Sequence, residues 1–420
     1  MVRVVMKFGG SSVADLGCIR RVARRIKAEL DDGNHVAVVV SAMAGETSRF
    51  IDLCRDLSSL HDVREHDAVA AAGEQVTAGL LAIALQDLGV VARSWAGWQV
   101  PIHTDGVHAR AHITHIETEG LLPGLLRGEV AVVTGFQGLG PGGRITTLGR
   151  GGSDASAVAL AAALDADICD IYTDVEGVYT ADPRWVEHAR KLTKMTYAEM
   201  LETASLGAKI LQVCSVEMAL RYGVRLQVRS SFSWETGTII CRENEIMEQD
   251  RPRSVVCSQA EAKITLTRVP SRPGGLAGIL RLLSSQRISA DMVVFNGAQG
   301  EESADLVFTV HRDDVERSVG ILEGVRQKIG FYQIHIDSCV TKVSVVRLGM
   351  CSRSESVHAL LSALEVQQIV LQALVVSEMK VSILVDESSA QKVVQVLHTA
   401  CQLDSIRKDE ECDAVMRKVT

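Results

Sequence analysis

The sequence has few aromatic residues: Phe, Trp and Tyr make up 4% of its 420 residues. A chain this poor in aromatic side chains must build its core mainly from aliphatic side chains. Hydrophobic residues of all kinds make up 47% of the sequence, and charged residues make up 23%. These proportions are those of ordinary soluble domains, and they exclude a disordered chain, a collagen and a coiled coil. At this length we expect two or three domains.

Cysteine pairs at metal-binding or redox spacing are absent: the ten cysteines are scattered, and no CxxC motif occurs. The N-terminal MVRVVMKFGG lacks the layout of a cleavable signal. No apolar run approaches the roughly 18 residues of a membrane span. We therefore expect a cytosolic chain with reduced thiols, without a disulfide framework, a zinc site or a membrane partner.

Positive charge is in deficit as well, because 44 Lys and Arg residues stand against 52 Asp and Glu residues, a formal net charge of −8. The whole chain therefore has no electrostatic reason to bind nucleic acid. One basic run interrupts this pattern, and we interpret it as a solvated or interface face of a helix. It consists of Arg20, Arg21, Arg24, Arg25 and Lys27.

Histidines cluster in one place, and four of them lie within thirteen residues, at His103, His108, His112 and His115. His112 and His115 are three residues apart and would share one face of a helix, a spacing that suits a transition metal. No neighbouring cysteine and no Glu-x-x-His pattern completes such a site. We therefore interpret these histidines as solvated side chains and predict no metal centre held by the protein.

The first half of the chain alternates strand and helix patterns. Apolar or β-branched runs predict strands at 2–8, 35–42, 130–136, 167–174 and 225–230, and helical spacing predicts helices at 15–30, 66–88, 153–166 and within 197–222. Ser153 is the expected cap of the helix at 153–166. Such alternation is typical of an α/β fold with a mostly parallel sheet and helices on both faces. Ligands of these sheets bind at loops beyond the carboxyl ends of the strands.

The composition changes near residue 245, where the charged, proline-containing stretch ENEIMEQDRPRS (243–254) predicts a linker. Beyond it the chain repeats itself: AKITLTRV (262–269) aligns with TKVSVVRL (341–348), and Leu283 aligns with Leu364. Each copy has the pattern strand–helix–strand–strand–helix. A tandem pair of small α+β copies predicts a regulatory or binding unit that is separate from the first sheet.

The segment MKFGGSSV (6–13) places Lys7 at the end of a predicted strand, just before Gly9 and Gly10. Glycine amides can approach a phosphate closely, and a lysine would neutralise its charge, so the segment suits a phosphate cradle. The alternative is a tight turn beside a solvated lysine. The segment is not a Walker A loop, because GxxxxGK[ST] does not occur.

The segment GRGGSD (149–154) lies between a predicted strand and a predicted helix. Arg150 could bind a small carboxylate with both arms of its guanidinium group, while the amides that follow would meet an anion at the helix N-terminus. The simpler interpretation is a capped helix with Asp154 placed favourably at the positive end of the helix dipole. Both interpretations can hold at once.

Six segments, in this order, resemble those of the aspartate kinase family, within the amino-acid kinase superfamily with C-terminal ACT repeats. They are MKFGGSSV (6–13), VVSAMAGET (39–47), AAGEQV (71–76), TTLGRGGSD (146–154), YTDVEGVYTADPR (172–184) and GAKIL (207–211). The resemblance covers nearly the whole chain. It implies an amino-acid kinase domain at 1–245, a linker at 246–262 and two ferredoxin-like ACT domains at 263–337 and 338–420.

The resemblance implies a binding site for L-aspartate. In the family a glutamate matching Glu74 receives the amino group of the substrate, the loop matching 149–154 holds the substrate, and an aspartate matching Asp154 orients a catalytic lysine. The implied substrate-binding residues are Ser41, Thr47, Glu74, Arg150, Gly151, Gly152 and Ser153.

The resemblance also implies an ATP site, with Mg²⁺ held mainly by ATP oxygens. The implied ATP-binding residues are Lys7, Phe8, Gly9, Gly10, Thr173, Asp174, Tyr179, Asp182, Arg184 and Lys209. The implied catalytic residues are Lys7, Asp154 and Lys209. The implied reaction transfers the γ-phosphoryl group of ATP to the side-chain carboxylate of aspartate, the first step of lysine, threonine and methionine biosynthesis. Two alternatives stay open: a non-catalytic amino-acid sensor, and a kinase acting on another amino acid or on a nucleotide.

The ACT resemblance implies feedback by an amino acid and at least a dimer formed through residues 263–420. The implied effector residues are Ser271, Asp291, Asn296, Ser377 and Glu378. The chain departs from the usual family pattern at Ser271, Ser289, Val370 and residues 354–355. It therefore stays open whether lysine, threonine, both or neither inhibits, and whether Met247 starts a separate regulatory subunit.

Overall fold

A computed structural model describes residues 2–149, 151–207, 210–246, 254–271, 274–296, 303–346 and 354–404. The chain forms two compact units. The first takes residues 1–178, 191–205 and 209–249, and the second takes residues 179–190, 206–208 and 250–420. The chain therefore enters the second unit briefly at 179–190 before it completes the first.

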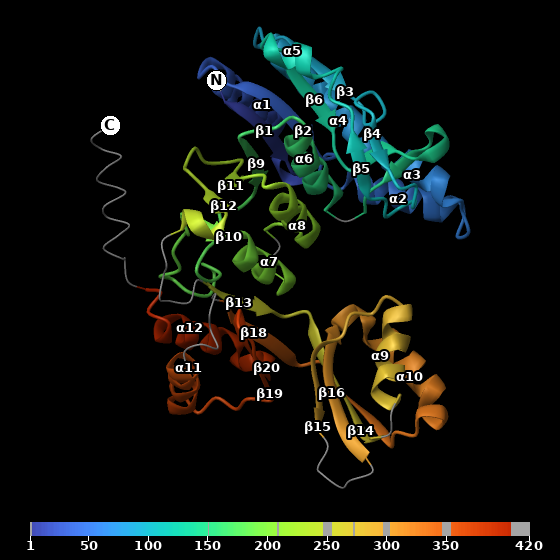
Figure 1. Ribbon diagram of the computed structural model, residues 1–420, viewed down its shortest axis with the longest axis vertical. Coiled ribbons are helices and arrows are strands. Elements are labelled where there is room, and N and C mark those ends of the chain that lie inside the picture. Colours follow the sequence, from blue (N-terminus) through green and yellow to red (C-terminus); the bar gives the residue numbers. More distant parts are fainter. Residues whose placement is uncertain are drawn as a thin grey trace. The chain divides into compact units, whose positions relative to one another are not determined.

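The first unit is built on an eight-stranded sheet in the order β10-β12-β11-β9-β1-β2-β6-β3 (Figure 1). The strands are β1 (Arg3–Phe8), β2 (His35–Val40), β3 (Ala92–Trp95), β6 (Val130–Thr134), β9 (Ile168–Thr173), β10 (Lys194–Thr196), β11 (Leu226–Ser230) and β12 (Thr238–Cys241). Neighbouring strands run parallel except β11 and β12. This confirms the predicted mostly parallel α/β sheet.

Helices cover both faces of this sheet. The helices of the described first unit are α1 (Leu16–Asp31), α2 (Glu46–Leu57), α3 (Val63–Ala70), α4 (Ala72–Asp87), α5 (Leu122–Leu126), α6 (Gly152–Ala163), α7 (Tyr197–Ser205) and α8 (Val213–Tyr222). Helices α1 and α4 pack into the core of one face, and α6 and α8 into the core of the other. Strand β2 serves both cores, because Val38 and Val40 point to one face and Ala37 and Val39 to the other.

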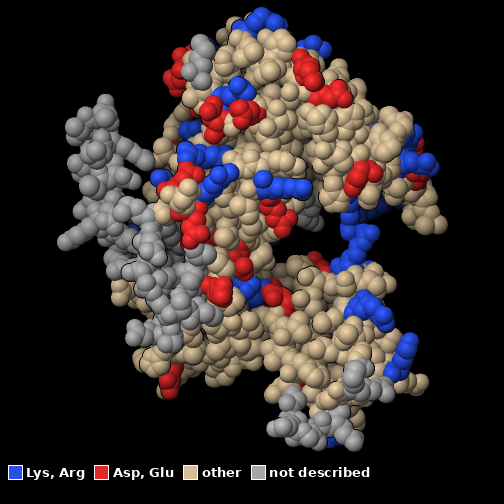
Figure 2. Space-filling view, viewed as in Figure 1, with Lys and Arg blue, Asp and Glu red and all other residues tan. Residues whose placement is uncertain are grey.

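Helix α1 follows the predicted amphipathic pattern. Asp15 caps its first turn by accepting a hydrogen bond from the Cys18 amide at 2.8 Å. Its predicted apolar residues are all buried: Ile19, Val22, Ala23 and Ile26. The basic run on this helix is divided, because Arg25 is buried against Tyr172 and Trp234 while its neighbours are mostly exposed. The prediction of a wholly solvated or interface face is therefore wrong at Arg25. On the face shown in Figure 2, basic residues of the first unit are interspersed with acidic ones.

A second, smaller sheet in the first unit holds the histidine-rich segment. Its order is β5-β4-β7-β8, with β4 (Ile102–Thr104), β5 (Ile113–Ile116), β7 (Gln137–Leu139) and β8 (Ile145–Thr147). His115 lies on a strand, so the helix face considered for His112 and His115 is wrong. Each of the other three histidines contacts a carboxylate at 2.7 Å: His103 with Glu117, His108 with Asp67 and His112 with Asp105. The prediction of solvated histidines is wrong at His108, because its side chain is only 15% exposed and binds the buried Asp67. Within the described ranges, no group of three or more possible metal ligands occurs.

Helix α6 begins one residue earlier than the sequence predicts. Gly151, at φ +76°, occupies the cap position, and no side chain caps the helix. Ser153 therefore lies within the first turn and is not the cap. A glycine in the left-handed region turns the chain sharply before the helix without a steric cost.

One stretch of the first unit contradicts the expectation that no apolar run has the length of a membrane span. Residues 63–87, which form α3 and α4, are long and apolar enough to cross a membrane, but half of the most apolar window is buried inside the molecule. Leu81 and Leu85 of α4 pack against the central sheet. A core helix accounts for this composition.

The second unit contains two four-stranded antiparallel sheets, in the orders β15-β16-β14-β17 and β13-β18-β20-β19. The strands are β13 (Ser254–Ser258), β14 (Glu261–Pro270), β15 (Asp291–Asn296), β16 (Ser303–His311), β17 (Gln333–Asp337), β18 (Val340–Val346), β19 (Ala373–Val376) and β20 (Lys380–Asp386). Helices α9 (Gly275–Ser285) and α10 (Val315–Ile329) pack on the first sheet, and α11 (Ser354–Val366) and α12 (Ala390–Ala400) on the second. Leu283 and Leu364, which the repeat aligns, are both buried in these cores. The expected pair of α+β copies is confirmed.

The stretch expected to be a linker contributes to these sheets. Residues 254–258 form β13, which pairs antiparallel with β18 from Ser254 opposite Val346 to Ser258 opposite Lys342. The first strand of the second sheet therefore precedes the whole first copy in the chain. A repeat alignment does not detect this strand, because β13 lies outside both aligned copies.

The segment 179–190 is tied to the second sheet of the second unit. Ala181 and Val186 are buried in the same core as Val255, Val343 and Leu397. The hydroxyl of Thr180 lies 2.8 Å from Nε2 of the fully buried His398, whose Nδ1 lies 2.7 Å from the Asp404 carboxylate.

Two glycines allow a matched test of the packing. A Cβ on Gly237 would lie 1.6 Å from the carbonyl oxygen of Val228, whereas a Cβ on Gly79, in helix α4, meets no atom within 4 Å. Gly237→Ala should lower the thermal unfolding midpoint clearly, with a loss of about 2 kcal/mol or more, because the backbone must move. Gly79→Ala should leave or raise the midpoint, by up to about 1 kcal/mol in stability. Circular dichroism melts of both variants would measure this, and an unchanged midpoint in Gly237→Ala would contradict the packing at this turn.

Candidate active site

Lys7 reaches the candidate site because of the two-residue alternation of strand β1. Val4, Met6 and Phe8 point into the core beneath α1 and α4. Val5 points to the opposite face, and Lys7 follows it on the side of helix α6. The strand ends at Phe8, so the ammonium group of Lys7 lies near the carboxyl edge of the sheet.

The ammonium group of Lys7 forms an ion pair with Asp154, with 2.6 Å between Nζ and Oδ1. Both side chains are nearly buried, with 11% and 12% of their surfaces exposed. Asp154 lies in the first turn of α6, where the dipole of the helix also favours its negative charge. The pair holds one cation at the positive end of the α6 dipole, beside Gly151, Gly152 and Ser153, which line the cavity.

Glu74 is the second buried acidic residue of the site. Gly73 lets helix α4 approach the β2 loop closely, because a Cβ there would lie 2.6 Å from Cβ of Ala42. At this distance Oε1 of Glu74 accepts a hydrogen bond from the Ala42 amide at 3.0 Å. Oε2 is buried and has no hydrogen-bond partner among the residues that the structure describes. Burial raises the pKa of Glu74 to about 7.

A cavity of about 350 Å³ lies between these two acidic residues. Segments that follow β1, β2, β6 and β8 contribute its walls, as expected for a ligand site at the carboxyl edge of a parallel sheet. The lining residues are Lys7, Gly10, Ser41, Ala42, Met43, Ala44, Gly45, Thr47, Ser48, Glu74, Phe136, Gly149, Gly151, Gly152, Ser153 and Asp154.

Most of the predicted substrate-binding residues meet in this cavity. Those that line it are Ser41, Thr47, Glu74, Gly151, Gly152 and Ser153, together with the predicted catalytic residues Lys7 and Asp154. Arg150 and Lys209 lie outside the described residues. The sequence did not single out Phe136, since an apolar side chain carries no signal of a polar site. The residues 42–45 lie in the recognised segment 39–47, but only Ser41 and Thr47 of it were predicted to bind substrate.

The predicted nucleotide residues divide between the two units. Thr173 ends β9 and Asp174 follows it, both in the first unit. They lie next to the glycine pair, since the Gly9 amide donates a hydrogen bond to the Tyr172 carbonyl. Phe8 is fully buried and stacks on Tyr172 with 4.6 Å between ring centroids, so its side chain belongs to the core.

The remaining predicted nucleotide residues, Tyr179, Asp182 and Arg184, belong to the second unit. Arg184 is exposed, and its guanidinium group donates to the Asp182 carboxylate at 2.6 to 3.1 Å. These hydrogen bonds hold the pKa of Asp182 below its usual range. Asp182 is therefore an anion that already has a cation as its partner.

The predicted effector residues lie on the sheets of the second unit. Asp291 begins β15 and forms an ion pair with the buried Lys342 of β18, at 2.6 Å between Oδ2 and Nζ. Lys342 also contacts Glu261 at 2.9 Å. Asn296 ends β15 and lies opposite Asp305. The turn before β20 contains Ser377 and the exposed Glu378. Ser271 is exposed just after β14. Asp291 is therefore committed to a contact between the two copies.

Comparison with known proteins agrees with this site. The model of the amino acid kinase family matches residues 2–230. An aspartate kinase of Pseudomonas putida is 44% identical over 98% of this chain and 100% of its own length, and aspartokinase 2 of Bacillus subtilis is 41% identical over 95% and 98%. The structure of E. coli aspartokinase III with aspartate and ADP superposes with a TM-score of 0.75 at 25% identity, covering 94% of this chain and 99% of that one. The chain belongs to the amino acid kinase family and, within it, to the aspartate kinases.

Proposed function

We propose that the cavity between Lys7 and Glu74 is where the γ-phosphoryl group of ATP passes to the side-chain carboxylate of L-aspartate, giving 4-phospho-L-aspartate and ADP. The observation that carries this assignment is the separation of charge inside one small cavity. A buried carboxylate with a free oxygen lies on one side, and a lysine at a helix N-terminus lies on the other. An amino acid with an ammonium group at one end and a carboxylate at the other matches this pattern.

Glu74 would bind the ammonium group of aspartate through its free Oε2. Ser41 and Thr47, which also line the cavity, would offer hydroxyl groups to the same ligand. Arg150 and the amides of Gly151, Gly152 and Ser153 would hold the α-carboxylate, with the bidentate geometry that a guanidinium group allows. Aspartate would thus be oriented with its side chain toward Lys7.

The chemical step requires charge stabilisation and positioning by the protein. The side chain of free aspartate has a pKa of about 3.9, so the nucleophile is already an anion at neutral pH and no general base is required. The barrier comes from bringing two anions together. Lys7, Lys209 and the amides at the N-terminus of α6 would stabilise the negative charge on the transferring group, while Asp154 fixes the position of the Lys7 ammonium.

Mg²⁺ is part of this proposal, bound mainly by the phosphate oxygens of ATP. The ranges that the structure describes contain no group of three possible metal ligands. When bound, the ion supplies charge neutralisation between the phosphates. On the protein side, Thr173 and Asp174 of the first unit would contact the nucleotide. For Tyr179, Asp182 and Arg184 the nucleotide role rests on the family resemblance alone. We propose that the reaction takes place in the cytosol.

Removal of Lys7 tests the catalytic assignment. Lys7→Ala should lower kcat by about 10²-fold or more, because it removes a charge directed at the transferring phosphoryl group. Lys209→Ala should have an effect of the same kind. Lys27→Ala is the matched control, since Lys27 forms an exposed pair with Asp31 on α1, and it should keep the wild-type kcat. Steady-state assays with hydroxylamine trapping would measure these rates, and near-wild-type turnover by Lys7→Ala would exclude its catalytic role.

The pKa of Glu74 predicts how aspartate binding depends on pH. Since burial raises this pKa to about 7, Glu74 takes up a proton below that pH and loses the charge that attracts the substrate ammonium. The kcat/KM for aspartate should therefore fall about tenfold between pH 8 and pH 6, since this parameter reports the free enzyme. Glu74→Gln should show a low and flat profile over the same range. A wild-type profile without this fall would place the amino group elsewhere.

We also propose that the chain assembles through its ACT domains and that an amino acid held there regulates it. Strand β15 is a sheet edge and exposes three consecutive apolar residues, Val293, Val294 and Phe295, by 40%, 37% and 38%. Exposed apolar edges favour association. An effector that binds one assembled arrangement better than another would shift the balance between them.

Sedimentation of the full chain, with and without lysine plus threonine, tests assembly. The chain should sediment as a dimer or larger, and Phe295→Glu should weaken the association because it places a charge on the apolar edge. Val366→Glu, at a residue 78% exposed on α11, is the matched control and should leave the association unchanged. A monomeric wild-type chain would contradict the assembly.

Inhibition by lysine or threonine should be weaker than in a chain that has the usual family pattern, because of the departures at Ser271, Ser289 and Val370.

A further inference from the structure

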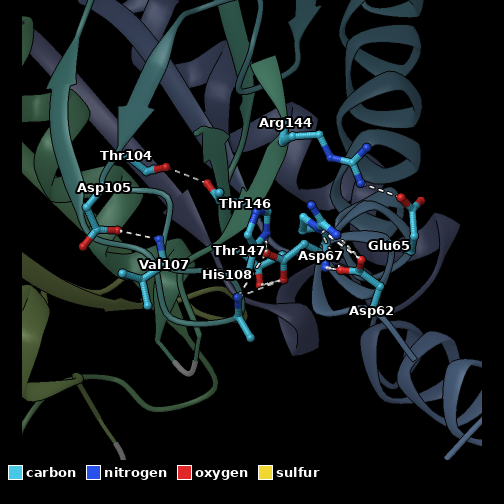
Figure 3. A network of polar contacts seen from close by, with 12 residues as sticks. Asp62, Glu65, Asp67, Thr104, Asp105, Val107, His108, Arg144, Thr146 and Thr147 are labelled. Atoms are coloured by element: carbon cyan, nitrogen blue, oxygen red, sulfur yellow. Dashed lines mark hydrogen bonds and ion pairs between the residues drawn. The ribbon is translucent and has the colours of Figure 1, made fainter. Parts of the chain in front are cut away.

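Asp67 is a fully buried acidic residue outside the candidate cavity. It lies on helix α3 with 0% of its surface exposed. Its carboxylate meets three donors from two distant segments: the Thr147 hydroxyl at 2.6 Å, Nδ1 of His108 at 2.7 Å and the Ala109 amide at 3.0 Å. Figure 3 shows Thr147 and His108 converging on this side chain.

Fold stability alone does not account for such a residue. A buried carboxylate loses its hydration, and well-packed apolar residues are often as stabilising as a buried polar cluster. Asp67 has no Lys or Arg among its contacts within the described part of the chain, so hydrogen-bond donors compensate its burial. We therefore ask which segments of the chain the three donors hold in place.

Thr147, one of the three donors, lies just before the loop that we assign to aspartate binding. Thr147 ends strand β8, and Gly149, two residues further, lines the cavity. The Thr147 carbonyl accepts a hydrogen bond from the Ala111 amide at 2.9 Å, which joins the strand to the segment that carries His108 and Ala109. Asp67 thus fixes the strand that enters the loop 149–153.

Ala109 shows that this segment is under constraint. Its φ of +64° lies in the left-handed region that disfavours residues with a Cβ. The Asp67 carboxylate holds its amide through both oxygens, at 3.0 and 3.1 Å. The Ala109 carbonyl oxygen would lie 3.1 Å from a Cβ on Gly149, so the strained residue packs directly against the start of the loop. Strain of this kind persists where surrounding contacts enforce it, often beside functional sites.

The helix that carries Asp67 is followed directly by the helix that carries Glu74. Only Ala71 separates α3 from α4, and Glu74 lies in the first turn of α4, seven residues after Asp67. The buried Gln137 of β7 donates a hydrogen bond to the Ala71 carbonyl at 2.8 Å, which fixes this junction to the small sheet. One carboxylate therefore joins the helix that leads to Glu74 and the strand that leads to the loop 149–153.

We propose that Asp67 is a positioning residue for aspartate binding, which holds the two walls of the substrate cavity at the separation that the amino acid requires. This inference rests on the proposed assignment of the cavity to aspartate. Asp67 acts through Thr147, His108 and Ala109 and does not touch the substrate. Its loss changes the recognition of aspartate and leaves the ATP side of the site intact.

The test compares the KM for aspartate with the KM for ATP in four variants. Asp67→Asn keeps the shape of the side chain but replaces one accepting oxygen with an amide NH2 group, which is itself a donor. Thr147→Val keeps the shape of the Thr147 side chain but removes its donating hydroxyl. Each should raise the KM for aspartate at least fivefold and change the KM for ATP less than twofold. Thr147→Ser restores the hydroxyl and should return the KM for aspartate to near the wild-type value. Glu65→Gln is the matched control, because Glu65 lies on the same helix in an exposed pair with Arg144 and should behave as wild type.

Thermal melts of the same variants separate positioning from stability. If Asp67→Asn and Thr147→Val lower the unfolding midpoint but leave the KM for aspartate unchanged, or change both KM values equally, the inference is wrong. Thr147→Val decides the matter if Asp67→Asn does not fold.

Arg150→Lys, assayed in parallel, distinguishes this inference from the proposed site. It keeps the charge but loses the planar fork, so it should raise the KM for aspartate far more than the KM for ATP. If Arg150→Lys has this effect while the Asp67 and Thr147 variants do not, only the positioning role fails. If Arg150→Lys changes neither KM, the assignment of the cavity fails.

Discussion

The ion pair between Lys7 and Asp154 joins the two elements that create the site, strand β1 and helix α6. Phosphoryl transfer between two anions requires positive charge at a fixed place, and a lysine side chain has several rotatable bonds. Asp154 removes that freedom, since it binds the ammonium at 2.6 Å where little water reaches it. The same contact sets the end of β1 against the N-terminus of α6. The positive end of the α6 dipole and the charge of Lys7 therefore lie beside the same cavity.

The described part of the first unit holds five buried acidic residues, and their partners explain their different roles. Glu199 accepts hydrogen bonds from the amide and the hydroxyl of Thr196. Asp154 has Lys7, and Asp170 has Arg229 at 3.0 Å, although burial still raises the pKa of Asp170 to about 6. Asp67 has three donors, none of them Lys or Arg. Glu74 has one backbone amide and neither a cation nor a set of donors among the described residues. A carboxyl group left in this condition gains most from a cationic ligand, which is why the ammonium group of the substrate is assigned to it.

The sequence predicts the parts of this fold that depend on local pattern. The strands β1 and β2, the buried face of α1 and the aligned Leu283 and Leu364 were all predicted from periodicity, and they are buried as expected. Predictions failed where distant residues decide the structure: β13 joins a sheet formed later in the chain, and the histidine segment becomes a strand because β4 pairs with it. Most of the site residues were available from motif resemblance, since Lys7, Glu74 and Asp154 lie in recognisable segments. The role of Asp67 could not be predicted in this way, because it depends on a hydrogen bond to Thr147, which lies eighty residues away in the sequence.

The passage of residues 179–190 through the second unit has a consequence for dividing the molecule. A break anywhere in 247–253 would leave this segment on the N-terminal fragment, while its apolar partners on β13, β18 and α12 would belong to the C-terminal fragment. Ala181 and Val186, now 4% and 5% exposed, would become a ready-made hydrophobic interface, and the Thr180 hydroxyl would lose the buried His398. Two polypeptides encoded separately would therefore be held together by the surface that now forms an interior. A chain of this fold can be split in its covalent structure while its core stays in one piece.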